Sequence, residues 1–542
     1  MPVSRRSFLG GGLAAAAAAV AVTGTPLLAG CASDKKNAAA ANAAVKLPTY
    51  TKYGEIKPDL PGTDVVLDGF LKYPANPVKA ITEVPGDGKP ITFMTNIPGA
   101  IPPAADQNQF WQEVNKRLGS ELQISMASND EYKDKFATRI AGGDLPDILN
   151  IPTDTPQIPG LVKSKCMDLT EHLSGDAAKK YPFLANIPSE YWKGCVFNGA
   201  IYGVPVPRGM SRTSLALYRE DLLAAKGIKN PAPKNFQEFF DLAKEMTAPK
   251  QNKWAWTRVP ISTIRMMLGI PNVWKQDGGK FSSMHEHEAQ QQALEAARKM
   301  VAAGVINPDA FNDKASARKQ WFNGGIAAFD YDSFVAWNQY YADNTGDPTF
   351  GVNMMDVPGF DSGDGKPWMG SALNNVTSFS KDSKHSAETL LKVANWMAAP
   401  FGTEEYLFRK YGVAGRHYTL QGTDPIPTKV GTVETGIGLQ YISDSTLALY
   451  WAGKPDVPQK QHAIQQKVAD RLVYDASYGL YSDTLSKKQA QLNKTMLDLE
   501  NQIVQGKKPV SAWAAGVQDW KSAGGDKIRT ELEQAHADTA GK

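Results

Sequence analysis

The residues from Lys89 to Ile151 alternate between short apolar runs and amphipathic helical patterns. The runs "KPITFMTN" and "ELQISMAS" predict strands, while "NQFWQEVNKRLG" carries apolar residues at every fourth position and predicts a helix. A second helical pattern ends at Gly142-Gly143, and another apolar run follows Pro146. Strands that alternate with crossover helices build a parallel sheet, so this stretch predicts an α/β fold with helices on both faces of a mostly parallel sheet.

The same pattern returns later in the chain without a recognisable internal repeat. A strand and then a helix are predicted in "GAIYGVPVP" and "TSLALYREDLLAAKGI", and four amphipathic helices are predicted in "NFQEFFDLAKEMTA", "EAQQQALEAARKMVAAGV", "HSAETLLKVANWMAA" and "LNKTMLDLENQIVQG". With 542 residues, the chain is long enough for two or more lobes.

The first thirty residues have the layout of an export signal. Arg5 and Arg6 precede an apolar stretch that glycines interrupt, and this stretch is too weakly apolar for a span of about 20 residues. "SRRSFL" resembles a twin-arginine signal, although an ordinary secretory signal with two arginines is the alternative. "LAGC" resembles the bacterial lipobox, which predicts removal of residues 1–30 and a lipid anchor on Cys31. The polar, Ala-rich residues after Cys31 predict a flexible tether.

The net charge bears on whether the protein binds nucleic acid, and the cysteines bear on whether it contains a disulfide. The formal charge of +3 includes Arg5 and Arg6, so the chain from Cys31 onward carries +1, which argues against nucleic-acid binding. An exported protein retains disulfides, so Cys166 and Cys195 are predicted to bond. Closing a loop of about 30 residues would stabilise the fold by roughly 3 kcal/mol. Two separate buried thiols are the alternative.

Several segments, in order, resemble the extracellular solute-binding proteins of ABC importers, in particular the large group that binds oligosaccharides such as aldouronates or alginate. The similarity covers residues 88–540 and lies in "YKDKFATRIAGGDLPDIL", "FNGAIYGVPVP", "LALYREDLLAAKGIKNPAPKNFQEFFDLAKEM", the stretch from "VWKQDGGK" to "GVINPDAF", "KYGVAGRHYTL" and "LENQIVQGKKPVSAWAAGVQDWKSAGGDKI". The resemblance implies a two-lobed periplasmic-binding-protein-like fold of type II, with a ligand cleft between lobes that close by a hinge motion.

The resemblance also implies how the chain divides. The expected parts are a signal peptide at 1–30, a tether and lead-in at 31–87, a first part of lobe 1 at 88–213, a first part of lobe 2 at 214–330, a return segment of lobe 1 at 331–378, and the rest of lobe 2 with the C-terminal helices at 379–542. By analogy with the family, the chain should cross between lobes near Ser211–Leu217, Phe329–Val335 and Val376–Ser380.

No metal or other cofactor is predicted. Some members of the group bind calcium in an acidic loop, but the matching segment "MTAPKQNKWAWT" has no carboxylate, and calcium takes about six to eight oxygen ligands. The "HEH" at His285–His287 lacks the i, i+4 spacing of a helical zinc pair.

A sugar cleft presents aromatic rings to the C–H faces of sugar rings, and polar groups to the hydroxyls. The chain holds 12 Trp and 19 Tyr, enough to supply such a cleft. The predicted ligand-binding residues, each with a core or ion-pair role as its alternative, are Asn96, Arg208, Trp254, Trp256, Tyr331, Asp332, Trp337, Trp368, Arg416 and Tyr418. The arginines would also suit an acidic sugar. Tyr202 and Trp396 are assigned to the core.

We therefore expect a monomeric, lipid-anchored, non-enzymatic protein on the outer face of the membrane that binds an oligosaccharide and delivers it to an ABC permease. A secreted carbohydrate-active enzyme is one alternative, although no G-x-S-x-G, HExxH, P-loop or CxxC motif occurs. A cell-surface sensor or adhesin with the same fold is another.

Overall fold

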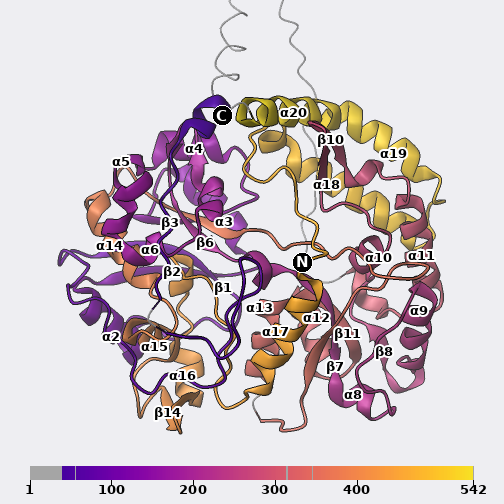
Figure 1. The fold of residues 1–542 in the computed structure, drawn as a ribbon, viewed down its shortest axis with the longest axis horizontal. Helices are drawn as coiled ribbons and strands as arrows, with labels where there is room; N and C mark the ends of the chain where they lie inside the picture. Colours follow the sequence, from indigo (N-terminus) through magenta and orange to yellow (C-terminus); the bar gives the residue numbers. More distant parts are fainter. Residues whose placement is uncertain (1–38, 55, 313–314, 345, 541–542) are drawn as a thin grey trace, which may run out of the picture. The chain divides into compact units, whose positions relative to one another are not determined.

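The computed structural model describes residues 39–54, 56–312, 315–344 and 346–540 (Figure 1). The export signal, the lipobox and Cys31 lie outside the described residues, so their predicted processing stays a prediction. Within the described ranges, no helix is long and apolar enough to cross a membrane.

The first sheet has the strand order β2-β1-β3-β13-β6. Its strands are β1 (Ile91–Ile97), β2 (Leu122–Ser128), β3 (Ile148–Pro152), β6 (Val204–Pro207) and β13 (Leu373–Phe379). β1 pairs in parallel with both β2 and β3, as the alternating sequence pattern predicted. β13 is antiparallel to β3 and β6, so a strand from far along the chain lies between two strands from the first half.

Local signals fix the helices of this first lobe. α2 (Gln109–Leu118) begins where the Asn108 side chain accepts a hydrogen bond from the Trp111 backbone amide, and it ends at Gly119 with a φ of 65°. α3 (Tyr132–Gly142) ends at Gly143 with a φ of 74°, as the glycine pair predicted. The other elements that contribute to the first lobe are α4 (Ile158–Lys165), α5 (Thr170–Leu173), α6 (Pro182–Ala185), α7 (Ser189–Trp192), β4 (Val196–Phe197), β5 (Ala200–Ile201), α14 (Ala387–Met397), α15 (Glu404–Tyr411), β14 (Tyr418–Gln421), β15 (Asp424–Pro427), α16 (Lys429–Glu434) and η8 (Leu439–Tyr441).

The second sheet has the order β12-β7-β11-β8. Its strands are β7 (Ser214–Arg219), β8 (Trp254–Trp256), β11 (Ala327–Ser333) and β12 (Val352–Met355), and β11 is parallel to β8 but antiparallel to β7. The helices and the hairpin of this second lobe are α8 (Glu220–Ala224), α9 (Phe236–Glu245), α10 (Ile261–Met267), β9 (Trp274–Asp277), β10 (Lys280–Ser283), α11 (Gln290–Ala302), α12 (Ala315–Asn323), α13 (Phe334–Asp343), α17 (Asp456–Ala469), α18 (Asp483–Val504), α19 (Ala512–Trp520) and α20 (Asp526–Ala540).

The chain passes between the two sheets at places that differ in part from those predicted. It leaves the first sheet after β6 and joins the second at β7, so residues 208–213 form a crossing that overlaps the first predicted one. It returns between β12 and β13, over residues 356–372. A third passage lies between α16, which contacts α2, and α17, which contacts β12. Phe329–Val335 lies within the second lobe and Val376–Ser380 runs along β13 and just past its end, so these two predicted crossings are wrong.

The boundaries expected at 330 and 378 do not coincide with a change of sheet. β12 belongs to the second sheet, although 331–378 was assigned to lobe 1. α14 buries Leu390, Leu391 and Ala394 in the core of the first lobe, although 379–542 was assigned to lobe 2. An apolar helix face in the sequence does not reveal which sheet covers it, because both lobes offer equivalent apolar surfaces.

The lead-in before β1 is attached to the body from residue 39 onward, so the flexible tether predicted in the polar residues from Ala32 to Tyr50 is wrong for the described part of that stretch. The Thr49 amide donates to the Gly175 carbonyl over 3.0 Å, and the Phe70 amide donates to the Leu449 carbonyl over 2.8 Å. The Ile81 amide donates to the Glu405 carboxylate over 2.9 Å. These contacts join the lead-in to segments far along the chain, which composition alone does not indicate.

Cys166 and Cys195 are both free and buried, so the predicted disulfide is wrong. Cys166 belongs to the apolar cluster around α3 and α4, whereas Cys195 packs in a separate cluster with Leu373 and Val376. Burial raises the pKa of the Cys166 thiol to about 12, and burial also raises the pKa of Cys195. The alternative of two separate buried thiols is the one that the structure adopts.

Candidate functional site

Three asparagines form a hydrogen-bonded row at the carboxyl ends of the parallel strands β1, β2 and β3. The Asn150 side-chain amide donates to the Asn96 side-chain oxygen over 2.9 Å, and the Asn96 amide donates to the Asn129 side-chain oxygen over 2.6 Å. Parallel strands bring their carboxyl ends to one edge, where open α/β sheets bind ligands. Asn96 therefore lies at the predicted place, half-buried, with neighbours that sequence reasoning did not select.

The second sheet places a cation, a phenol and a carboxylate at the carboxyl ends of its parallel pair, β8 and β11. Arg258, just after β8, donates to the Tyr331 carbonyl, and its guanidinium lies 5.1 Å from the centre of the Tyr331 ring. Burial raises the pKa of Tyr331 to about 12, so its hydroxyl stays protonated. Asp332, next along β11, is half-buried. Tyr331 and Asp332 were predicted, whereas Arg258 was missed.

Arg212 lies in the crossing that joins β6 to β7 and interacts with groups of both lobes. It is exposed, and it donates to the Asn374 side chain of β13 over 3.3 Å. Desolvation and the neighbouring Arg208 lower the pKa of Arg212, while Asp332 of the second lobe raises it. The sequence signal for Arg212 was a second arginine within "RGMSR".

Aromatic side chains lie beside this crossing. The Tyr191 hydroxyl approaches Gly209, whose φ of 50° and lack of a Cβ leave room for it, since a Cβ at this position would lie 2.5 Å from that oxygen. The Tyr478 hydroxyl donates to the Tyr191 carbonyl over 3.1 Å. Tyr474, which is 54% exposed, interacts electrostatically with Tyr191. Trp368 is half-buried, and its indole N–H donates to the Ile270 carbonyl over 2.8 Å, which fixes the ring. Of these aromatic residues, only Trp368 was predicted.

The amino-acid sequence matches a known family. A family model described as "Bacterial extracellular solute-binding protein" matches residues 100–403. The chain belongs to this family. The polygalacturonan/rhamnogalacturonan-binding protein YtcQ of Bacillus subtilis is 23% identical over 78% of this chain and 87% of its own length. Lipoprotein LipO of the same organism is 22% identical over 80% of this chain and 89% of its own length.

Solved structures with similar folds are solute-binding proteins as well. The alginate-binding protein AlgQ2, without calcium ion, superposes with a TM-score of 0.61 at 17% identity, over 83% of this chain and 98% of that one. The N-glycan transport solute-binding protein NgtS of Streptococcus pneumoniae, in complex with Man5GlcNAc, superposes with a TM-score of 0.59 at 16% identity, over 84% and 99%. These likenesses confirm the predicted two-lobed α/β fold.

Two predicted tryptophans of this solute-binding protein lie in its core. Trp256 is 1% exposed and stacks on Phe329 with ring centres 5.1 Å apart, and Trp337 is fully buried. A ring enclosed by core side chains offers no face to a sugar, so the prediction that these two contact ligand is wrong. Trp254 is half-buried at the opposite end of β8 from Arg258, away from the strand ends that carry the candidate site. The spacing of two residues correctly placed Trp254 and Trp256 on one face of the strand. It did not indicate which end of the strand lies at the candidate site.

The predicted arginines both have carboxylate partners within the protein. Arg416 donates to Glu434 over 2.6 Å, and Arg208, 8% exposed, lies 3.3 Å from Asp444. Arg416 is therefore matched by a carboxylate, whereas Arg208 shares Asp444 with Arg409 and Lys410. Tyr418 is buried in β14 with its ring edge toward Tyr411, which indicates a packing role. Tyr202 and Trp396 are buried, as predicted.

The "HEH" segment has structural roles. Burial lowers the pKa of His285 to about 4, and its ring packs between Trp513 and Trp520. Glu286 pairs with Lys521 and Arg529. Among the residues that the structure describes, no group of three His, Cys, Asp or Glu side chains is arranged to hold a metal ion.

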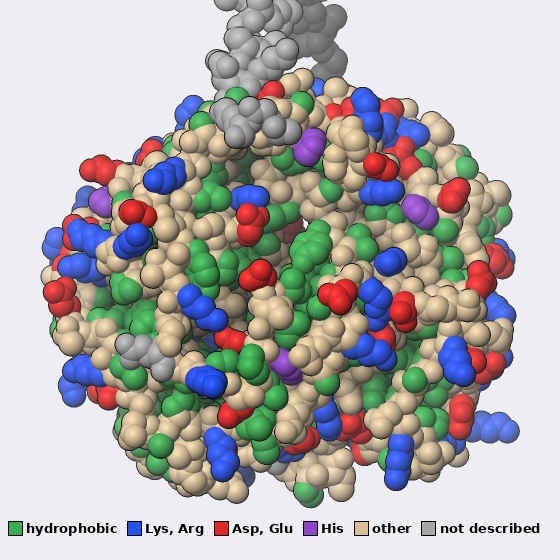
Figure 2. All heavy atoms as spheres, in the orientation of Figure 1, with side chains coloured by type: hydrophobic (Ala, Val, Ile, Leu, Met, Phe, Trp, Pro, Cys, Tyr) green, Lys and Arg blue, Asp and Glu red, His purple; other side chains and the backbone are tan. Residues whose placement is uncertain are grey.

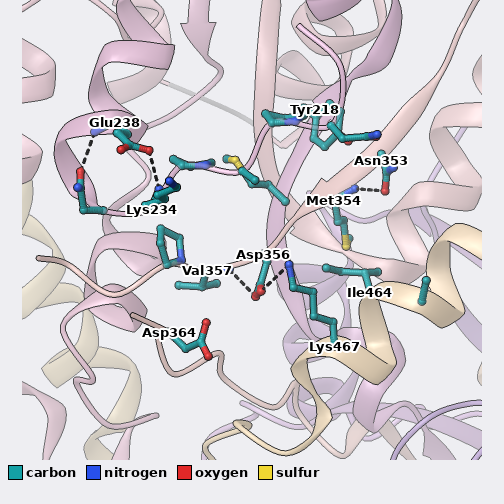
Figure 3. A pocket seen from close by; sticks show the side chains of 18 of the residues that line it. Tyr218, Lys234, Glu238, Asn353, Met354, Asp356, Val357, Asp364, Ile464 and Lys467 are labelled. Carbon is teal, nitrogen blue, oxygen red and sulfur yellow. Dashed lines mark hydrogen bonds and ion pairs between the residues drawn. The ribbon is translucent and has the colours of Figure 1, made fainter. Parts of the chain in front are cut away.

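A cavity of about 820 Å³ in the second lobe lies beside the edge strand β12, between residues 230–235 and α17 (Figure 3). Two of its lysines are already paired, since Lys460 lies 2.8 Å from Glu220 and Lys467 lies 3.2 Å from Asp356. Glu238 accepts a hydrogen bond from the Lys234 backbone amide over 2.9 Å. The cavity borders the edge strand rather than the carboxyl ends of β8 and β11, so it is not the candidate site.

Proposed function

We propose that this solute-binding protein captures an oligosaccharide outside the cytoplasmic membrane and delivers it to the permease of an ABC importer. One observation supports this most strongly. Side chains of both lobes meet at one crossing, where Arg212 donates to Asn374 of the first lobe and interacts electrostatically with Asp332 of the second, next to Tyr331 and Arg258. Planar polar groups beside aromatic rings suit the hydroxyls and C–H faces of sugars.

The names of the relatives support a saccharide ligand. YtcQ is named as binding polygalacturonan and rhamnogalacturonan, and AlgQ2 as binding alginate. The NgtS structure is a complex with Man5GlcNAc. An extended ligand bound between lobes would be held by both sheets, and its binding would favour the closed form through contacts that only the closed form makes.

The mature protein in this proposal is an exported monomer, anchored through a lipid on Cys31. The export motif and "LAGC" support this, together with the relative named lipoprotein LipO. The balanced charge argues against a nucleic-acid partner, and Figure 2 shows acidic and basic side chains interspersed over the face that it draws. The family of binding proteins argues against the alternative of a secreted carbohydrate-active enzyme.

Calorimetric titration of the mature chain with a panel of plant and host oligosaccharides tests the proposal. We expect at least one ligand to bind with a dissociation constant in the micromolar range or below, to remain chemically intact after incubation, and to reduce the radius of gyration in X-ray scattering. Release of reducing ends would favour the enzyme, and tight binding without compaction would contradict hinge closure.

A further inference from the structure

Asp444 lies in the segment that leaves the first lobe after η8, and three cations surround it. Arg409 donates to its carboxylate over 2.9 Å, the Arg208 guanidinium lies 3.3 Å away, and the Lys410 ammonium lies 3.8 Å away. The side chains of Arg409 and Asp444 are each 1% exposed, whereas that of Lys410 is 30% exposed. We call Arg208, Arg409, Lys410 and Asp444 the Asp444 cluster.

The Asp444 cluster carries more positive than negative charge. In the described part of the chain, no second carboxylate lies within 4 Å of any of the three cations. The pKa of Lys410 is lowered to about 8, chiefly by desolvation and also by the nearby Arg409 and Arg208, although Asp444 raises it. Buried charges in proteins are normally paired, because an isolated charge loses its hydration without compensation.

Hydrogen-bond donors without partners accompany this excess of positive charge. The Arg409 Nε and the side-chain hydroxyls of Ser443, Ser445 and Thr446 are buried, and none has a hydrogen-bond partner among the described residues. The Asp444 Oδ2 is a buried acceptor without a hydrogen-bond partner in the same place, so the unpartnered donors outnumber the unpartnered acceptors. Ser443 and Ser445 flank Asp444 in the chain, and Thr446 follows Ser445. Buried polar groups in folded proteins are almost always hydrogen-bonded, so these donors require an acceptor.

An anion supplies both the missing negative charge and the missing acceptors. We propose that the Asp444 cluster binds an anionic group, either a small free oxyanion or the carboxylate of an acidic sugar. Arginine is suited to such groups because its planar guanidinium donates two parallel hydrogen bonds. Lys410, the most exposed member, forms the entrance. The acidic-sugar source rests on the proposed function, whereas the free-anion source does not.

Calorimetry at constant ionic strength tests the site with inorganic phosphate, a galacturonate oligosaccharide and a neutral galactose oligosaccharide as probes. Lys410→Gln removes the entrance cation but leaves Asp444 paired with Arg208 and Arg409. Lys392→Gln is the matched control, because Lys392 is a lysine of the same lobe, 41% exposed and 3.7 Å from Glu83. We expect the wild type to bind an anionic probe, Lys410→Gln to weaken that binding at least tenfold, and Lys392→Gln to change it less than twofold.

Competition distinguishes the two sources. If galacturonate displaces phosphate, the sugar carboxylate occupies the cluster, and if both bind independently, the cluster holds a free anion. Failure of both anionic probes to bind, or equal binding to the wild type and Lys410→Gln, would overturn the anion site. The neutral oligosaccharide reports separately on the proposed function, since its binding does not need an anion at Asp444.

Discussion

The Arg208 guanidinium lies 3.3 Å from the carboxylate of Asp444, and the two residues are 236 positions apart in the chain. Arg208 begins the first crossing between the sheets, and Asp444 lies in the third passage, after η8. Both side chains are buried. The ion pair therefore joins two of the three segments about which the lobes would rotate.

Asp444→Asn should lower the free energy of unfolding by about 3–5 kcal/mol, because it leaves two buried arginines without their carboxylate. Urea unfolding in low-salt buffer measures this. Asp364→Asn, at a carboxylate that is 73% exposed, should change the value by less than about 0.5 kcal/mol. Equal effects of the two substitutions would contradict the structural role of Asp444.

Trp256→Ala should cost about 3–5 kcal/mol of folding free energy, because the ring is enclosed by Phe239 and Phe329. Trp254→Ala, at a half-buried site of the same strand, should cost less than half as much. Chemical denaturation of both variants gives the comparison. If the Trp256 variant kept the stability of the wild type but no longer bound ligand, Trp256 would be a binding residue and the core assignment would be wrong.

Tyr474→Ala should weaken oligosaccharide binding about tenfold, or 1.4 kcal/mol, because an exposed ring beside the crossing is available for stacking. Its melting temperature without ligand should stay near that of the wild type, since the side chain is 54% exposed. Tyr50→Ala, 43% exposed on the lead-in, serves as the control that should bind normally. Unchanged affinity in the Tyr474 variant would remove this tyrosine from the site.

Glu434→Gln should destabilise the protein at pH 7 and weaken its acid dependence. Burial raises the pKa of Glu434, but hydrogen bonds from His417 and Arg416 and from the Phe110 amide outweigh it and lower the pKa overall. A carboxyl group with a lowered pKa in the folded state contributes stability above its unfolded pKa, near 4.5, and loses that stability as the pH falls below it. The difference in melting temperature between wild type and variant should therefore shrink from pH 7 to pH 3.5. A constant difference over this range would contradict the assignment.

Cys166 and Cys195 should react with a thiol reagent only after unfolding, because both are free, buried and have raised pKa values. Thiol titration of a Cys31→Ala variant purified from the exported fraction should give two equivalents in denaturant and none in native buffer. Reducing agent should leave the melting temperature unchanged. If no thiol reacted in denaturant, Cys166 and Cys195 would be bonded to each other after all.

Local sequence signals determined much of the fold. The strands around β1–β3, the N-cap at Asn108 and the helix end at Gly143 follow from apolar periodicity and capping chemistry, which act between near neighbours. The fold class and the family also followed from ordered motifs. Among the candidate site residues, Asn96 lies at a strand end as predicted, because the end of an apolar run is visible in the sequence, whereas Tyr331 and Asp332, predicted at a crossing, lie near the end of β11.

Only the tertiary structure decided the features that depend on distant segments. It inserted β13 between β3 and β6, placed α14 on the first lobe, and brought Asp444 to Arg208. It also buried Trp256, exposed Tyr474 and kept the two cysteines in different apolar clusters. The physical reason is that an apolar ring or a charged group specifies the kind of partner it needs, whereas the partner's identity depends on which chain segments meet when both lobes are complete.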